Sequence, residues 1–76
     1  MSEPNVWQLR AQRLVKAELA KRNMTYKDLS RRMAVLGVEC TAESIANRLS
    51  RQNFSAAFFI RCFDAMGAKN VSLDWE

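Results

Sequence analysis

Apolar residues recur at helical spacing along most of the chain and predict four helices separated by short turns. The first, over about residues 5–22, carries one apolar arc made of Trp7, Ala11, Leu14, Val15 and Leu19. The second opens at Thr25 and ends at Gly37, and its inward side chains are Tyr26, Leu29, Met33 and Leu36. A threonine is typical of a helix N-cap, and a glycine is typical of the residue that follows a helix.

The third predicted helix covers about residues 41–51 and buries Ile45 and Leu49, which lie one turn apart. The fourth is capped by Ser55, ends at Gly67 and is apolar nearly all round. A helix of that kind is either central to the core or half core and half interface. The pattern therefore predicts an all-α fold of four helices, with a core over about residues 5–67 in a single domain of residues 1–76.

The tail, residues 68–76, alternates Val71, Leu73 and Trp75 with polar residues, which is the period of a short strand. A strand needs a partner, and the same strand of a second subunit would supply one and form a dimer. The alternative is an irregular tail whose Trp75 packs on the core. The pattern alone allows both.

Length and composition indicate a small folded domain. A chain of 76 residues with 49% hydrophobic content can bury only a modest core, which dimerisation often supplements. No apolar run is long enough to span a membrane, and the first residues resemble neither a signal peptide nor a transit peptide. We therefore expect a cytoplasmic protein of a bacterium or phage, with no membrane partner.

Basic charge is unevenly distributed along the chain, whose net charge is +4. Residues 1–51 hold ten Lys and Arg against five Asp and Glu, whereas residues 52–76 hold two against three. This segregation suits a polyanionic partner, because fixed positive charges displace counterions from a phosphate backbone. A basic surface that is simply solvated is the alternative.

The sequence offers little of what catalysis or metal binding needs. It has no His, no Gly-rich phosphate loop and no Ser in a recognisable nucleophile motif. Cys40 and Cys62 alone cannot complete a tetrahedral zinc site. We expect no catalytic residue, metal, cofactor or small-molecule substrate. The cysteines are expected to be reduced thiols, Cys62 in the core and Cys40 near a turn, with a disulfide as the alternative.

The outward face of the third helix favours duplex DNA, whose major groove of about 12 Å admits one helix. Asn47 can bind adenine through two hydrogen bonds, and an Arg can bind guanine or phosphate. Glu43 is unfavourable near phosphate unless it accepts from a cytosine amino group. The candidate contacts on this helix are Thr41, Ser44, Asn47, Arg48 and Arg51, and those to the flanking phosphate backbone from the second helix are Tyr26, Lys27 and Arg31.

Several of these segments resemble known families. Residues 23–30 (NMTYKDLS), Ile45, Arg51 with Gln52, and the apolar residues 58–67 resemble lambda-repressor-like helix-turn-helix proteins of the Cro/C1 or XRE type. Residues 7–67 are more similar still to DUF6471, a family of small bacterial proteins without an assigned activity. The residues that match it are Thr25, Tyr26, Leu29, Met33, Gly37, Val38, Ile45, Ser50, Arg51, Phe54, Ser55, Ala56, Ala57, Phe58, Phe59, Cys62, Ala65 and Gly67.

The helix-turn-helix resemblance implies that Tyr26 stands where a Gln usually contacts phosphate, and that Ser44 and Asn47 lie where bases are met. The sequence differs from the helix-turn-helix pattern at two places that affect the register of those contacts. The link from Met33 to Ile45 is longer than in compact repressors, and Gln52 replaces a glycine that usually follows the Arg.

These features together predict a small DNA-binding transcriptional regulator. It would read double-stranded DNA as a homodimer, with one third helix in the major groove of each half-site. The alternative is a protein-interaction module on the same scaffold, such as an antitoxin, a phage inhibitor of a host factor or an adaptor. Such a module would dock through an apolar surface around Phe58, Ile60 and Trp75.

Overall fold

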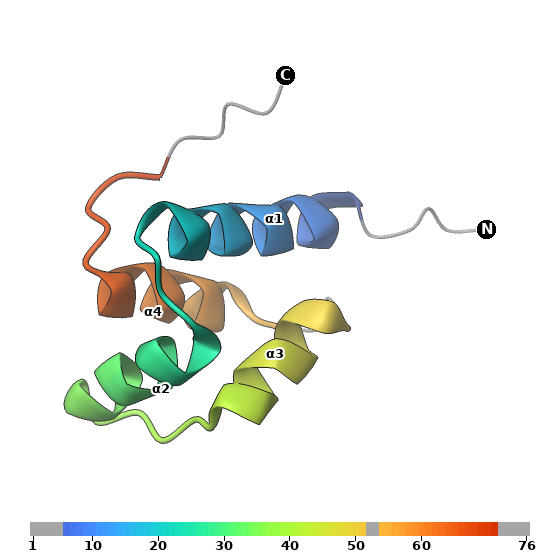
Figure 1. The fold of residues 1–76 in the computed structure, drawn as a ribbon. Coiled ribbons are helices and arrows are strands. Elements are labelled where there is room, and N and C mark those ends of the chain that lie inside the picture. Colours follow the sequence, from blue (N-terminus) through green and yellow to red (C-terminus); the bar gives the residue numbers. More distant parts are fainter. Residues whose placement is uncertain (1–5, 52–53, 72–76) are drawn as a thin grey trace.

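The computed structural model describes residues 6–51 and 54–71, and this part of the chain forms four α-helices (Figure 1). They are α1 (Val6–Lys21), α2 (Tyr26–Val35), α3 (Ala42–Ser50) and α4 (Ala56–Met66). The helix α4 packs against α1 and α2, and α2 also packs against α3. The prediction of an all-helical fold with four helices is confirmed, and each helix lies within two residues of its expected bounds.

A hydroxyl side chain begins each of the last three helices. Thr25, Thr41 and Ser55 accept hydrogen bonds from the backbone N–H groups of Asp28, Ser44 and Phe58, respectively. The Asp28 carboxylate accepts in return from the backbone N–H of Thr25 at 2.9 Å, which closes a capping box. These caps satisfy amides that have no partner within the helix and so determine where α2, α3 and α4 start.

Left-handed residues end three of the helices. Gly37 and Gly67 have φ angles of +83° and +81°, which glycine adopts without steric cost. After α4, the N–H of Gly67 donates to the Asp64 carbonyl and that of Ala68 to the Phe63 carbonyl. Beyond α1, Asn23 takes the same conformation with φ of 56°, which asparagine tolerates better than most residues.

The core lies between the helices and contains the inward face of each one. Its buried apolar members are Val15, Leu19, Leu29, Met33, Ile45, Leu49, Phe58, Cys62, Phe63, Ala65 and Met66. Gln12 of α1 is buried beside them. Cys62 and the half-buried Cys40 are both free thiols, so the disulfide alternative is wrong.

Two apolar residues that periodicity assigns to the inside are exposed. Trp7 is 69% exposed because Phe54 and the start of α4 leave a groove beside its ring instead of covering it. Leu36 is 48% exposed because α2 ends at Val35, so helical periodicity no longer directs its side chain inward. The expectation for Trp7 is corrected by where a neighbouring helix begins, and that for Leu36 by where its own helix ends.

The described part of the tail, residues 68–71, is irregular, and residues 6–51 and 54–71 contain no strand. Val71 is exposed there. Leu73 and Trp75 lie outside the described residues, as does Gln52, so strand pairing between two subunits stays a prediction. Over the same described ranges, no helix combines the length and apolar character needed to cross a membrane.

Candidate functional site

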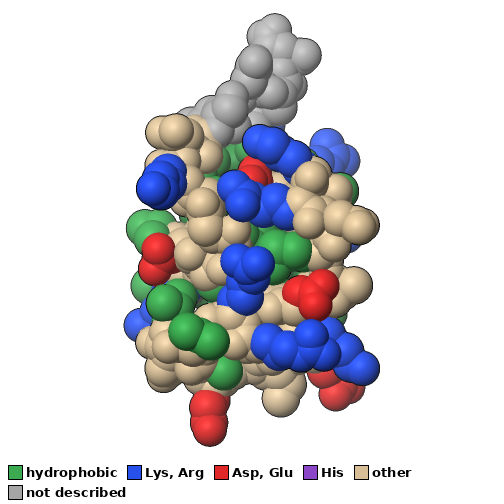
Figure 2. All heavy atoms as spheres, turned by 60° about the vertical axis from the view of Figure 1, so that its left-hand side comes forward, with side chains coloured by type: hydrophobic (Ala, Val, Ile, Leu, Met, Phe, Trp, Pro, Cys, Tyr) green, Lys and Arg blue, Asp and Glu red, His purple; other side chains and the backbone are tan. Residues whose placement is uncertain are grey.

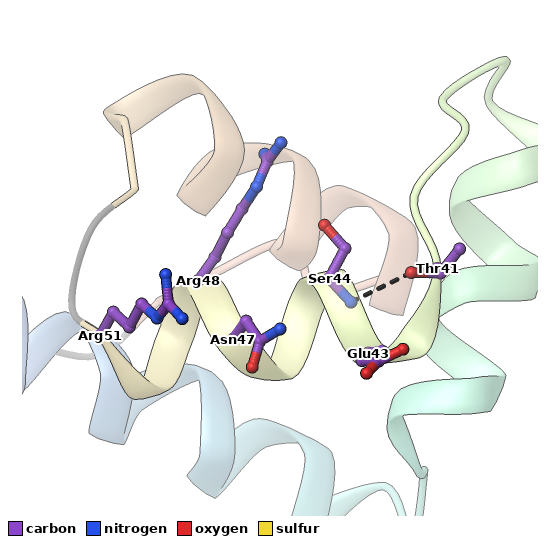
Figure 3. A pocket seen from close by; sticks show the side chains of 6 residues that line it. All are labelled: Thr41, Glu43, Ser44, Asn47, Arg48 and Arg51. Carbon is purple, nitrogen blue, oxygen red and sulfur yellow. Dashed lines mark hydrogen bonds between the residues drawn. The ribbon is translucent and has the colours of Figure 1, made fainter.

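The polar side of α3 surrounds a shallow hollow of about 310 Å³ (Figure 3). Thr41, Glu43, Ser44, Asn47, Arg48 and Arg51 line it. The structure therefore brings together all five residues that the sequence predicts on this helix. Glu43 is the sixth, and the sequence prediction left it out because a carboxylate is unfavourable beside phosphate.

Asn47 lies at the centre of the exposed side of α3. Ile45 and Leu49 are fully buried, and the mean direction of these two positions is about 180° from that of Asn47 on a helix of 3.6 residues per turn. Glu43 and Arg51 each stand four residues from Asn47 and so share its side of the helix. The set Glu43, Asn47 and Arg51, all exposed, is called the outer stripe below.

The outer stripe has a regular backbone over its whole length. Glu43 is in the first turn of α3, where its charge complements the helix dipole. Arg51 is the C-cap, and its φ of −84° and ψ of −4° continue the right-handed helical geometry. Its N–H donates to the Asn47 carbonyl at 2.9 Å. The three side chains are therefore held at helical spacing.

Thr41 and Ser44 border the hollow at the N-terminal end of α3. The Thr41 hydroxyl oxygen accepts from the Ser44 N–H at 3.0 Å, which leaves its O–H able to donate. Ser44 is half-buried, and its hydroxyl lies 3.8 Å from the Cys40 thiol. These two hydroxyls sit at the end of the helix that favours negative charge, such as a phosphate.

Arg48 differs from the other predicted DNA contacts on α3 because its side chain contacts another helix. Its guanidinium carbon lies 5.0 Å from the centre of the Phe58 ring on α4, in a cation–π contact. Figure 3 shows this side chain pointing away from Asn47. Spacing on α3 could not reveal this placement, because the partner ring comes from another helix.

The three predicted contacts on α2 do not line the α3 hollow. Lys27 and Arg31 are exposed, and Arg31 lies 3.4 Å from the Asp28 carboxylate. Tyr26 is half-buried and packs on the core; burial, and to a lesser degree the neighbouring Cys62, raises the pKa of its hydroxyl. Its ring lines a separate hollow of about 360 Å³ together with Lys16 of α1.

Basic side chains extend well beyond α3. The helix α1 contributes Arg10, Arg13, Lys16 and Lys21. Figure 2 shows Lys and Arg side chains at several places across one face, with acidic and apolar groups between them. The positive charge that the sequence places in residues 1–51 is thus spread over α1, α2 and α3.

The described residues hold no metal-binding group, and the thiol of Cys62 is poorly ionised. No group of three or more His, Cys, Asp or Glu there is arranged to hold a metal ion. Burial, reinforced by Cys40, raises the pKa of Cys62 to about 12. The Cys62 thiolate, which is the reactive form of a cysteine, is therefore scarce at neutral pH.

One protein-family model matches the part of the chain that forms the four helices. The family model described as "Domain of unknown function (DUF6471)" matches residues 7–71. The chain belongs to the DUF6471 family. The DUF6471 match runs from the first turn of α1 past the end of α4, so it includes α3 and the core beneath it. None of the curated proteins or solved structures compared with the chain matches it.

Proposed function

We propose that this DUF6471 protein is a small DNA-binding transcriptional regulator of the lambda-repressor-like helix-turn-helix type. In this proposal α3 enters the major groove of duplex DNA. The observation that carries it is the outer stripe, Glu43, Asn47 and Arg51, which is exposed on a helix whose other side is buried. Each of the three residue types can make paired hydrogen bonds or an amino-group contact to a base edge in the major groove.

The connection between α2 and α3 supports the proposal. Residues 36–41 join the helices, and the Ser30 hydroxyl of α2 donates to the Cys40 carbonyl in this turn at 2.6 Å. The Val38 N–H also donates back to the Met33 carbonyl at 2.9 Å. These bonds hold a turn longer than the usual three to four residues of a helix-turn-helix, so α3 has a defined orientation on α2.

Further phosphate contacts in this proposal come from outside the hollow. Lys27 and Arg31 are exposed on the same helix as the capping box, and the first helix of a helix-turn-helix crosses the DNA backbone. Tyr26 is half-buried against the core, and it lines a hollow together with Lys16, so a phosphate contact from Tyr26 is proposed on that surface. The dispersed basic groups of α1 add a sequence-independent attraction to DNA.

The test is the salt dependence of binding to a fluorescently labelled random-sequence duplex, followed by anisotropy. Each phosphate contact lowers the slope of log K against log salt by about 0.9, so contacts from Lys27, Arg31 and one further Lys or Arg give a slope of roughly −3 for each bound subunit. Retention on heparin and elution by a salt gradient should accompany it. A protein that passes through heparin at low salt and leaves the anisotropy unchanged would contradict the proposal.

One observation favours the second candidate, a protein-interaction module. Ile60 of α4 is 64% exposed, as an apolar docking surface requires. Phe58, predicted to share that surface, is instead buried in the core, and Trp75 lies outside the described residues. Ile60→Ser would separate the two candidates, because it should leave duplex binding intact. A homodimer on a two-fold site is part of the first proposal, and light scattering at the DNA-binding concentration tests it.

A further inference from the structure

We propose that Glu43, Asn47 and Arg51 each read a different base pair of one half-site, and that Arg48 reads none. This inference rests on the proposed function, because it names the DNA sequence class that the same helix would select. It reassigns two residues: Glu43 becomes a base contact, and Arg48 becomes a contact between α3 and α4 instead of a DNA contact.

Spacing along α3 separates the three readers. Four residues of helix advance about 6 Å, and successive base pairs of a duplex are about 3.4 Å apart. Neighbouring members of the outer stripe therefore address positions about two base pairs apart. The whole stripe spans roughly five base pairs, a length that one helix in the groove can cover.

The hydrogen-bonding groups of each side chain predict which base it would bind. An Arg pairs with the O6 and N7 acceptors of guanine, an Asn pairs with N6 and N7 of adenine, and a Glu accepts from the N4 amino group of cytosine. The half-site is thus expected to hold a cytosine, an adenine and a guanine at about every second pair. Their order follows α3 from Glu43 through Asn47 to Arg51.

Glu43 can serve as a reader because its carboxylate is not committed elsewhere. Among residues 6–51 and 54–71, neither Glu43 nor Asn47 uses its side chain in a hydrogen bond or ion pair. A carboxylate beside Asn47 on the outermost side of α3 repels phosphates. That repulsion is offset only where the carboxylate meets a hydrogen-bond donor, and cytosine presents one in the major groove.

Arg48 is excluded as a reader by its partner. Its guanidinium lies over the Phe58 ring of α4, so base contact would require leaving that ring. Arg51 has no aromatic ring in such contact among the described residues, and its planar group is free to form the paired bonds that guanine accepts. The two arginines of one helix are thereby given different roles.

The experiment is selection from random duplexes with the full chain and five variants. Glu43→Gln, Asn47→Ala and Arg51→Ala should each lose preference at one base pair, by roughly tenfold to a hundredfold, and keep it at the other two. Glu43→Gln should also bind random duplex several-fold more tightly, because a repelling charge is gone. Arg48→Gln should keep all three preferences. Asp64→Asn on α4, an exposed site with the same charge change as Glu43→Gln, should keep them too.

The outcomes separate this inference from the proposed function. If the unaltered protein selects a site and the three stripe variants select the same site, the inference is wrong and the DNA-binding proposal stands. A change of base preference in Arg48→Gln would also overturn it. If the unaltered protein binds no duplex, both fail together. Each variant is expected to fold, because all the substituted side chains are exposed. The helix content of each one is checked by circular dichroism.

Discussion

The guanidinium carbon of Arg48 on α3 lies 5.0 Å from the centre of the Phe58 ring on α4. Arg48 is exposed, whereas Phe58 is buried in the core. The contact therefore connects the outer side of α3 to the helix that packs against both α1 and α2. A cation–π contact at an exposed site contributes about 0.5–1 kcal/mol, which is large enough to measure in the stability of the fold.

A double-mutant cycle measures this contact. Arg48→Gln removes the cation, and Phe58→Leu removes the ring while keeping an apolar side chain in the core. The free energies of unfolding in urea should show a coupling of about 0.5–1 kcal/mol between the two changes. Arg13→Gln on α1 is the control and should add to Phe58→Leu without coupling. Simple additivity for Arg48 and Phe58 would mean that the contact does not stabilise the fold.

Asn47→Ala and Lys27→Ala should weaken DNA binding in different ways. Asn47 faces the bases in the proposal, so its loss should cost about 1–3 kcal/mol on a selected site and little on a random duplex. Lys27 is expected to contact phosphate, so its loss should weaken both duplexes alike and reduce the salt slope by about 1. Anisotropy titrations at several salt concentrations measure both effects. Equal behaviour of the two variants would refute the division into base and phosphate contacts.

The capping box of α2 should make stability depend on pH. The backbone N–H and hydroxyl of Thr25 donate to the Asp28 carboxylate and lower its pKa, with smaller effects from Arg31 and Arg32. Because the folded pKa lies below the unfolded one, this stabilisation is complete above the unfolded pKa. It is lost as the pH falls through the folded pKa. The melting temperature of Asp28→Ala should therefore lie below that of the unaltered protein at neutral pH and converge with it in acid.

Thr25→Ala is the matched control for that experiment. It should cost about 1 kcal/mol at neutral pH, the usual effect of losing a hydroxyl cap. In a protein that already carries Thr25→Ala, the fall in melting temperature caused by Asp28→Ala should be smaller. The pH dependence of that fall should be smaller too. A difference that persists unchanged from neutral to acid pH would show that the carboxylate charge has no part in the cap.

The two cysteines should differ in reactivity. Cys62 is fully buried and its pKa is raised to about 12, whereas Cys40 is only half-buried. Iodoacetamide at about pH 8 should therefore label Cys40 alone in the folded protein and both residues in denaturant, as mass spectrometry would show. The Cys40→Ser variant should take up label only after unfolding. Labelling of Cys62 in the folded protein would require α4 to leave the core.

Local signals in the sequence were sufficient for most of the fold. Thr25, Thr41 and Ser55 marked the helix starts, and Gly37 and Gly67 marked two of the ends, because capping and left-handed geometry depend on single residue types. Helical periodicity identified the buried residues wherever a helix packs against a neighbouring helix. It was wrong at Trp7 and Leu36, since no periodicity states where a neighbouring helix begins or where the same helix stops.

The sequence predicted which side of α3 forms the candidate site, but not which contacts its side chains make within the protein. Helical spacing brings the five predicted α3 residues to one side together with Glu43, which the sequence places on that side without assigning it a DNA contact. The Arg48 contact with Phe58 joins residues from two helices, so only the three-dimensional structure reveals it.

The most direct test of the account is an NMR titration of the ¹⁵N-labelled protein, whose mass is 8.7 kDa, with a selected duplex. The proposal that α3 enters the major groove predicts shift changes concentrated at Thr41, Ser44, Asn47 and Arg51, with smaller changes at Lys27 and Arg31. The amide of Ile60 on α4 should stay unperturbed. Shifts centred on Ile60, or no shifts at duplex concentrations far above that of the protein, would contradict the claim that α3 is the DNA-reading helix.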